Sequence, residues 1–326
     1  MKGSDAEGFV MVYSDVEGTG CSTCKGLVLE LIKDAEETEQ VEAPDSDTAR
    51  TEEDKPDYAA APIDLLWPNG QVFQVWILNT TDRRYFKQHI ELVKEVVKEW
   101  EKHANISFTF PEEWDPNSPP EVRLRFWDKQ PGFKPEQKGD NTDDGNWSYV
   151  GNSCQEIIQD GTKPNFWKPT MNLQRGDLSR PGPLESFKAT ILHEFGHMLG
   201  FMHEHQRPDG DLEHNYNLEE VYKHYRANGW KKDKVNEQVF DFHEYRTKSA
   251  IAGTRFDTTS IMMYDIPAKL LKDKTKAVKK NYTLSKLDKI WVARLYSKGV
   301  KERPEFQPRE IIPDHLERKG CLYPSL

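Results

Sequence analysis

The sequence has few cysteines and no long hydrophobic run. A chain of 326 residues can bury a core without disulfides, so its four cysteines need not be paired. No apolar run approaches about 18 residues, which excludes a membrane-spanning helix. The first 20 residues also lack the apolar core of a secretory signal. We therefore expect a cytoplasmic protein. A chain from which a signal had been removed would instead be secreted, and four N-x-S/T matches argue weakly in that direction.

An excess of positive charge is also lacking. The chain has 55 acidic and 45 basic residues and a net charge of −10, which disfavours nonspecific binding to nucleic acid or to anionic membranes. The imbalance is confined to residues 1–59, which hold 16 acidic and five basic residues. The other 267 residues hold 39 acidic and 40 basic ones. Residues 34–57 have almost no large apolar side chain. We therefore expect a mostly flexible acidic segment at 1–59 and a globular domain at 60–326.

Hydrophobic periodicity in the globular part predicts an α+β fold without internal repeats. Alternating or β-branched stretches predict strands, and apolar residues at 3.6-residue spacing predict helices. The stripe from Phe86 to Trp100 predicts one long helix, with Thr81 or Asp82 as its N-cap. The expected strands are 71–78, 122–127, 148–151 and 170–173. The other expected helices are 185–199, 218–227 and 285–296.

A metal-binding pattern lies on the helix expected at 185–199. His193 and His197 are four residues apart, so both imidazoles project from one helix face and can share a cation. Glu194 can reach a metal-activated water without being a ligand. Gly200 can adopt a positive φ, end the helix and turn the chain so that His203 supplies a third nitrogen. Three imidazoles leave one position open for water, as in catalytic zinc sites.

The same pattern is also consistent with a surface helix that carries solvated histidines and with a closed structural zinc site. The nitrogen-rich ligand set favours one zinc ion, although cobalt or nickel could substitute in vitro. The motif HExxHxxGxxH typically occurs with a downstream methionine turn. The segment Ser260-Ile261-Met262-Met263-Tyr264, whose Met262 lies 59 residues after His203, fits such a turn.

The run from His193 to Arg207, together with this turn, resembles the astacin family of zinc metalloendopeptidases in the metzincin clan. In that family a glutamate follows the third histidine and a tyrosine lies two residues after the turn methionine, and Glu204 and Tyr264 occupy these places. Further stretches at 66–70, 147–151 and 284–288, with 295–296, are similar to astacin domains in the same order. The resemblance covers about residues 60–300.

The resemblance implies a metzincin-type zincin fold. This fold has a twisted, mainly parallel sheet with an antiparallel edge strand, long helices, and an active-site cleft between two subdomains. It also implies that the enzyme binds a peptide or protein substrate, and we expect a monomer. His193, His197 and His203 would bind zinc, Glu194 would be the general base, and Tyr264 a switchable ligand that stabilises the oxyanion. Structural support would come from Gly200, Met262 and Glu204, and the substrate-pairing edge strand from Thr170, Met171, Asn172 and Leu173.

The sequence departs from the family at its cysteines. Two family cysteine positions are occupied by Asn105 and Asn146, so the usual disulfides are not reproduced, although Cys321 is a candidate leftover position. Cys21 and Cys24 form a lone CxxC pair, which is more often unremarkable or disulfide-capable than redox-active, metal-binding or latency-related. Cys154 has no assigned role.

Residues 1–59 have two interpretations. They form either an inhibitory pro-segment, whose removal near residues 58–61 frees an ammonium that pairs with Glu204, or a solubilising or partner-binding tail. The segment lacks the Phe-x-Gly-Asp motif of astacin propeptides. Because charge runs are mostly solvated, we favour the tail.

Three functions are consistent with this sequence: an astacin-like endopeptidase, a peptidase of another metzincin subfamily, and a catalytically silent peptide-binding module. The retained Glu194 argues against silence, and Glu204 with Tyr264 favours astacin. The scattered histidines at 89, 103, 205, 214, 224, 243 and 315 are assigned no catalytic role.

Overall fold

The computed structural model describes residues 61–62, 65–78, 86–113, 120–127, 145–158, 169–207, 210, 212–227, 229–240, 251–252 and 256–299. The acidic segment 1–59 lies outside these ranges, as do Cys21, Cys24 and Cys321, so the domain boundary at residues 59 and 60 stays a prediction. Within the described ranges, every helix is too short or too polar to cross a lipid bilayer.

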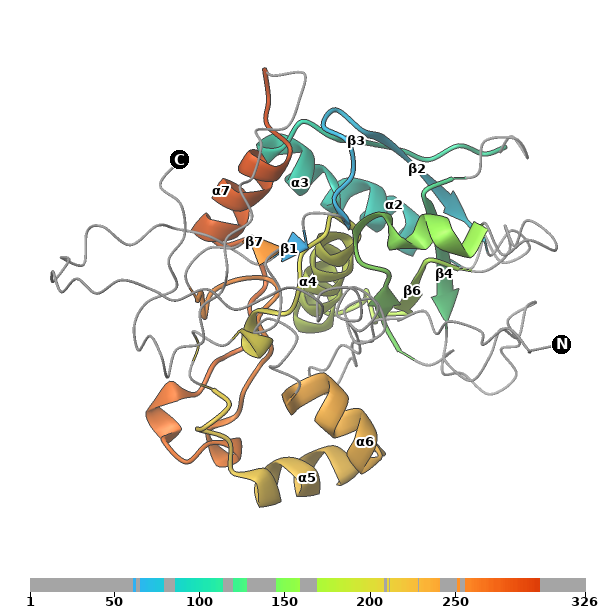
Figure 1. Cartoon of the computed structure of the whole chain (residues 1–326). Helices are drawn as coiled ribbons and strands as arrows, with labels where there is room; N and C mark the ends of the chain where they lie inside the picture. The colour runs from blue at the N-terminus through green and yellow to red at the C-terminus, as the bar shows by residue number, and fades with distance from the viewer. Residues whose placement is uncertain are drawn as a thin grey trace, which may run out of the picture.

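A five-stranded sheet forms one layer of the fold (Figure 1). Its strands follow the order β3 (Ser107–Thr109), β2 (Val72–Ile77), β4 (Val122–Trp127), β6 (Met171–Gln174) and β5 (Trp147–Ser148). All neighbouring pairs are parallel except β5 with β6, which is antiparallel. The expected α+β class and the mainly parallel sheet with an antiparallel edge strand are therefore confirmed.

The antiparallel edge of this sheet is formed by β5, not by the residues expected there. Strand β6 pairs with β4 on one side and with β5 on the other, so Thr170, Met171, Asn172 and Leu173 lie in and beside an interior strand. All four side chains are buried. The prediction that they form the edge strand is therefore wrong. A two-residue strand such as β5 is too short to show the alternation from which strands are recognised.

The predicted helices are present, with changed boundaries. The long helix expected up to Trp100 is divided into α2 (Lys87–Val96) and α3 (Lys98–His103). Val97 keeps helical angles, but the Trp100 N–H donates to the Val97 carbonyl at 3.1 Å, a tighter turn than the α-helical one. The expected N-caps, Thr81 and Asp82, lie outside the described ranges. The later helices are α4 (Pro181–Met198), α5 (Leu218–Ala227) and α7 (Lys286–Leu295).

Several short elements had no counterpart in the sequence-based expectation. In place of the strand expected at 148–151 the structure has β5 at Trp147–Ser148, and Gly151, with φ +53°, begins a 3₁₀ helix. Strand β3 was also not expected. The remaining short elements are β1 (Ala61–Pro62), which pairs with β7 (Ile251–Ala252), η3 (Gly151–Ile158), η4 (Glu204–Gln206), α6 (Lys232–Val235), the π-helix η6 (Asn236–Phe240), η8 (Ala268–Leu270) and η9 (Lys274–Lys276).

Helix α4 lies at the centre of the molecule and contacts α2, β5, β6 and η3 (Figure 1). Three aromatic side chains from distant parts of the chain fix its C-terminal half. The indole N–H groups of Trp67 and Trp100 donate to the carbonyls of Met198 and Leu192, at 2.8 and 3.2 Å. The Tyr296 hydroxyl donates to the Leu199 carbonyl at 2.8 Å. This end of α4 is therefore held rigidly in the core.

Candidate metal centre

Helix α4 ends in a glycine turn that redirects the chain. Gly200 has φ +99°, a conformation that favours glycine. Its N–H donates to the His197 carbonyl at 2.7 Å, and the Phe201 N–H donates to the Gly196 carbonyl at 3.0 Å. This pair of bonds is the Schellman arrangement that closes helix C-termini. As expected from the sequence, the turn brings the segment containing His203 back against the helix.

The three histidines of the motif converge on one point. The Nε2 atom of His197 lies 3.1 Å from Nε2 of His193 and 3.1 Å from Nε2 of His203. The possible ligand atoms of the three residues all lie within 4.8 Å of one another. Zn–N bonds of about 2.0–2.1 Å at tetrahedral angles place nitrogens roughly 3.3 Å apart, so these spacings fit a shared metal ion.

The other ring nitrogen of each histidine is held by an oxygen acceptor. Nδ1 of His193 donates to the Ile261 carbonyl at 2.8 Å, and Nδ1 of His197 donates to the Phe201 carbonyl at 2.8 Å. Nδ1 of His203 donates to Oε1 of Gln206 at 3.1 Å. Because the proton sits on Nδ1, each Nε2 presents a lone pair. Three lone pairs that face one another are stabilised by a cation between them.

Burial keeps these imidazoles neutral. It lowers the pKa of His193 to about 4. Burial, reinforced by the neighbouring imidazoles, holds the pKa of His197 and His203 well below the usual value. Only neutral histidine binds a metal, so at neutral pH the three side chains are ready to do so without first releasing a proton.

Met262 packs directly against α4. A Cβ atom added to Gly196 would lie 2.6 Å from the Met262 sulfur, so the thioether occupies the space that a side chain at residue 196 would need. Gly196 is flanked on the helix by Phe195 and the ligand His197. Met262 is itself 1% exposed. The methionine therefore lies against α4, the helix that carries His193 and His197.

Glu194 and Glu204 are both carboxylates removed from solvent, with exposed fractions of 0% and 1%. Glu194 follows His193 on α4. Oε1 of Glu204 accepts a hydrogen bond from the Asp257 N–H at 2.7 Å and lies 3.5 Å from Nε of the equally buried Arg207. The Glu204 N–H donates to the Met262 carbonyl at 3.1 Å. Glu204 therefore joins the segment after the third histidine to the methionine turn.

Tyr264 lies against the triad, and His205 lies against Tyr264. The ring centroids of Tyr264 and His203 are 4.7 Å apart at an interplanar angle of 62°. The rings of Tyr264 and His205 are stacked, with centroids 3.9 Å apart and an angle of 24°. Sequence reasoning gave His205 no role. The sequence feature that could have indicated a role is its position. His205 lies two residues after His203, just as Tyr264 lies two residues after Met262.

Of the other described histidines, two have clear structural surroundings. His89 is buried among Phe86, Phe126 and Phe187, with Nε2 2.9 Å from the Gly176 carbonyl. His103 lies 3.3 Å from Glu99 on its own helix. Neither belongs to the triad, in agreement with the sequence-based expectation.

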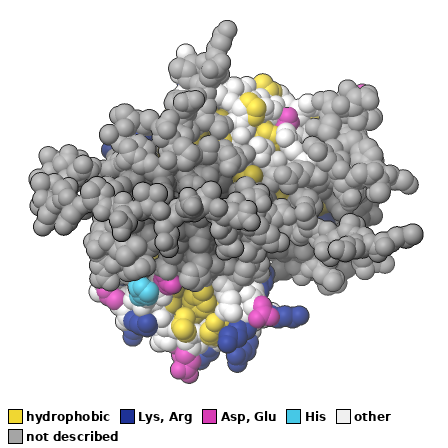
Figure 2. All heavy atoms as spheres, viewed as in Figure 1, with side chains coloured by type: hydrophobic (Ala, Val, Ile, Leu, Met, Phe, Trp, Pro, Cys, Tyr) yellow, Lys and Arg dark blue, Asp and Glu magenta, His cyan; other side chains and the backbone are white. Residues whose placement is uncertain are grey.

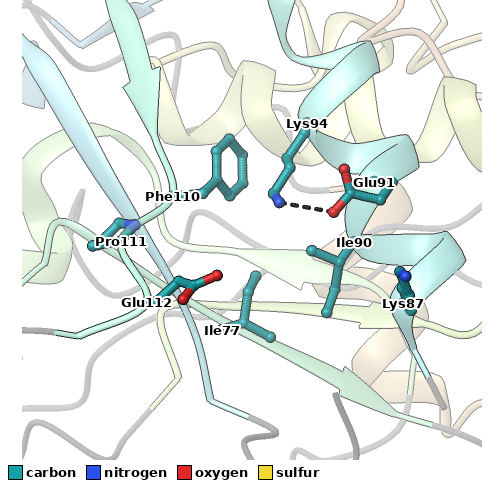
Figure 3. Close-up of a pocket in the computed structure, with 8 residues that line it drawn as sticks. All are labelled: Ile77, Lys87, Ile90, Glu91, Lys94, Phe110, Pro111 and Glu112. Carbon is teal, nitrogen blue, oxygen red and sulfur yellow. Dashed lines mark hydrogen bonds and ion pairs between the residues drawn. The ribbon is translucent and has the colours of Figure 1, made fainter. Parts of the chain in front are cut away.

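A pocket of about 260 Å³ lies apart from these histidines (Figure 3). It lies between β2, α2 and residues 110–112, with Ile77, Ile90 and Phe110 in its wall. A Glu91–Lys94 ion pair of 2.8 Å borders it. None of its lining residues supplies a ligand of the triad. The described surface near α5 and α6, in the lower part of Figure 2, mixes apolar and charged side chains of both signs.

Comparisons with known proteins match the region of the chain that contains these residues. The family model of Astacin, a peptidase family, matches residues 185–289, which include the triad, Met262 and Tyr264. A structure of myroilysin is 28% identical, with a TM-score of 0.57 over 74% of this chain and 100% of that chain. A crystal structure of myroilysin has 29% identity and a TM-score of 0.46, over 72% of this chain and 86% of that one.

The structure of high choriolytic enzyme 1, a hatching enzyme zinc-protease from Oryzias latipes (medaka fish), has 16% identity and a TM-score of 0.42, over 72% of this chain and 94% of that one. No curated protein sequence matches the chain. The family match over the metal-binding helix and the methionine turn agrees with the converging triad and with the fold shared with myroilysin. Over residues 185–289 the chain therefore matches the astacin peptidase family, and its fold is similar to that of myroilysin.

Proposed function

We propose that residues 60–326 form a zinc endopeptidase that cleaves peptide bonds in peptides or proteins. The observation that carries this proposal is the convergence of the three imidazoles. Nε2 of His197 lies 3.1 Å from Nε2 of each of the other two, and each Nδ1 donates to an oxygen acceptor. His193, His197 and His203 would hold one zinc ion. A bound zinc ion supplies Lewis-acid chemistry, which lowers the pKa of water and polarises a carbonyl.

Glu194 acts as the general base in this proposal. It follows the first ligand on α4 and is fully buried, so its carboxylate lies in a low-dielectric environment beside the cation site. A carboxylate in this setting takes a proton from the attacking water and returns it to the leaving amine. The conformation of α4 fixes this carboxylate relative to His193 and His197.

Tyr264 stabilises the charge that develops on the substrate carbonyl oxygen. Its ring lies against His203 and comes from the methionine turn, which is tied to the third-histidine segment through Glu204. A phenol held at this position donates a hydrogen bond to an oxyanion without a large rearrangement of its surroundings. Met262 and Gly200 support the ligands through packing and chain direction.

The proposal is tested by combining metal analysis with cleavage of a peptide library by wild type and Glu194→Ala. We expect one zinc per chain in both proteins and internal cleavage of peptides by the wild type alone. Wild-type protein that holds zinc and binds peptides without cleaving them would instead be a silent binding module. Removal of single terminal residues only would contradict the endopeptidase assignment.

A further inference from the structure

The stacking of His205 on Tyr264 is the closest ring contact in the site. Their centroids lie 3.9 Å apart at 24°, whereas His203 meets Tyr264 with a tilted ring at 4.7 Å and 62°. His205 and His203 are themselves 5.2 Å apart at 38°. The phenol ring therefore lies in a corner formed by two imidazoles, one a metal ligand and the other not.

This corner is buried and held at its base. His205 is 0% exposed and Tyr264 is 4% exposed, so neither ring is free to turn into solvent. The two rings belong to segments joined at two points by Glu204. Its N–H donates to the Met262 carbonyl at 3.1 Å, and its carboxylate accepts from the Asp257 N–H at 2.7 Å. The two segments that carry the stacked rings are therefore held together by hydrogen bonds of Glu204.

We propose that His205 is a positioning residue for Tyr264: its flat imidazole face fixes the plane of the phenol ring beside the metal centre. The inference rests on the role of Tyr264 in the proposed function and goes beyond it by assigning what holds that residue in place. The contact that acts is the ring face, because stacked rings attract beyond the area they bury. A flat apolar ring at residue 205 should therefore replace histidine, and a branched aliphatic side chain of similar bulk should not.

The experiment compares His205→Phe with His205→Leu, each alone and combined with Tyr264→Phe, in the zinc-loaded full chain. We expect His205→Leu to lower kcat by about 2- to 10-fold with little change in KM, because stacking energy is of that size. His205→Phe should stay within about twofold of wild type. In the Tyr264→Phe background, His205→Leu and His205→Phe should have the same kcat, since the residue that His205 positions has lost its hydroxyl. His103→Leu, on α3, is the control and should behave as wild type.

A second measurement does not depend on turnover. With ring-labelled tyrosine, the NMR signal lost in Tyr264→Phe identifies Tyr264. This signal should shift in His205→Leu and keep most of its ring-current displacement in His205→Phe, with and without zinc.

The possible failures are distinguishable. Wild-type activity in Tyr264→Phe would remove the role of Tyr264 from the proposed function, and the inference with it. If Tyr264→Phe is impaired but His205→Leu equals wild type, or if the losses of Tyr264→Phe and His205→Leu multiply, only the inference on His205 is overturned. An unchanged Tyr264 signal in His205→Leu would overturn it as well.

Discussion

Oδ2 of Asp288, in the first turn of α7, accepts a hydrogen bond from the Ile261 N–H at 2.8 Å, although 27 residues separate them. Its Oδ1 accepts from the Ser260 hydroxyl at 2.7 Å, and Oδ2 also accepts from the Ser285 N–H in a capping box. The carbonyl of Ile261 in turn accepts from Nδ1 of His193. One buried carboxylate therefore connects a helix N-terminus to the methionine turn and to His193 of the triad.

We expect Asp288→Asn to weaken metal binding and folding together. The substitution replaces one acceptor oxygen by an NH₂ group in a site where three donors meet. Losing such bonds in a buried site costs about 1–3 kcal/mol, and disturbing the support of a ligand lowers metal affinity about 10- to 100-fold. Urea unfolding and zinc competition with a chelator measure both effects.

Asp273→Asn is the matched control for this substitution. Asp273 also caps a short helix, accepting from the Thr275 N–H at 3.0 Å, but it lies at the surface. We expect the zinc affinity of Asp273→Asn to equal that of wild type. Equal behaviour of the Asp273 and Asp288 variants would contradict the connection from Asp288 to His193.

Gly200→Ala should be more damaging than an ordinary glycine substitution. At φ +99° an alanine is strained, and its Cβ would lie 2.6 Å from Cδ2 of Leu66. Gly229 has a similar φ of +84° with nothing within 4 Å, so Gly229→Ala measures the strain alone. We expect about 1–2 kcal/mol of destabilisation for Gly229→Ala and clearly more for Gly200→Ala.

Zinc affinity should separate these two variants further. Phe201, immediately after the turn, supplies the carbonyl that holds His197. We therefore expect a weaker zinc site in Gly200→Ala and an unchanged one in Gly229→Ala. The same loss of stability in both, measured by urea unfolding, would show that the contact with Leu66 is unimportant.

The zinc-free protein should lose stability as the pH falls from about 6.5 toward 4. Burial holds the pKa of folded His193 at about 4, whereas the unfolded chain titrates near 6.5. Between these values the unfolded chain binds more protons, so acid favours unfolding, by about 1.4 kcal/mol per pH unit for each such histidine. Urea unfolding at several pH values gives this slope. His193→Gln should reduce this slope by the contribution of about one proton. An unchanged slope in that variant would refute the assignment of the low pKa to His193.

Removal of residues 1–59 should leave the peptidase activity within about threefold of the full chain. Glu204, the proposed partner of a newly freed ammonium, already has Arg207 as a counter-charge, with 3.5 Å between Oε1 and Nε. Steady-state kinetics of both forms, with intact masses verified, test this expectation. An increase of more than about tenfold on truncation would favour an inhibitory pro-segment over a solubilising tail.

The clustering of the three histidines was predictable from the sequence because its geometry depends on local spacing. Positions i and i+4 of a helix share a face, and a glycine at the helix end redirects the chain, so His193, His197 and His203 were recognisable without tertiary information. The strands with strong β-branched or alternating patterns, such as 122–127, were predictable for the same reason.

The supporting contacts were not predictable because they join distant segments or use the backbone. The carbonyls of Ile261 and Phe201, which accept hydrogen bonds from His193 and His197, cannot be recognised from side-chain identity. His205 becomes important only once the methionine turn is folded against it. The edge position of β5 depends on the sheet order, which a two-residue strand does not reveal.

The central claim is that the triad holds one zinc ion that serves a hydrolysis in which Glu194 takes the proton. Its most direct test is to titrate zinc into zinc-free wild type and Glu194→Ala while peptide cleavage is recorded. The account predicts that wild-type activity rises linearly and saturates at one zinc per chain, and that Glu194→Ala binds the same amount of zinc without cleaving peptide. Cleavage by zinc-free protein, or by Glu194→Ala at the wild-type rate, would contradict it.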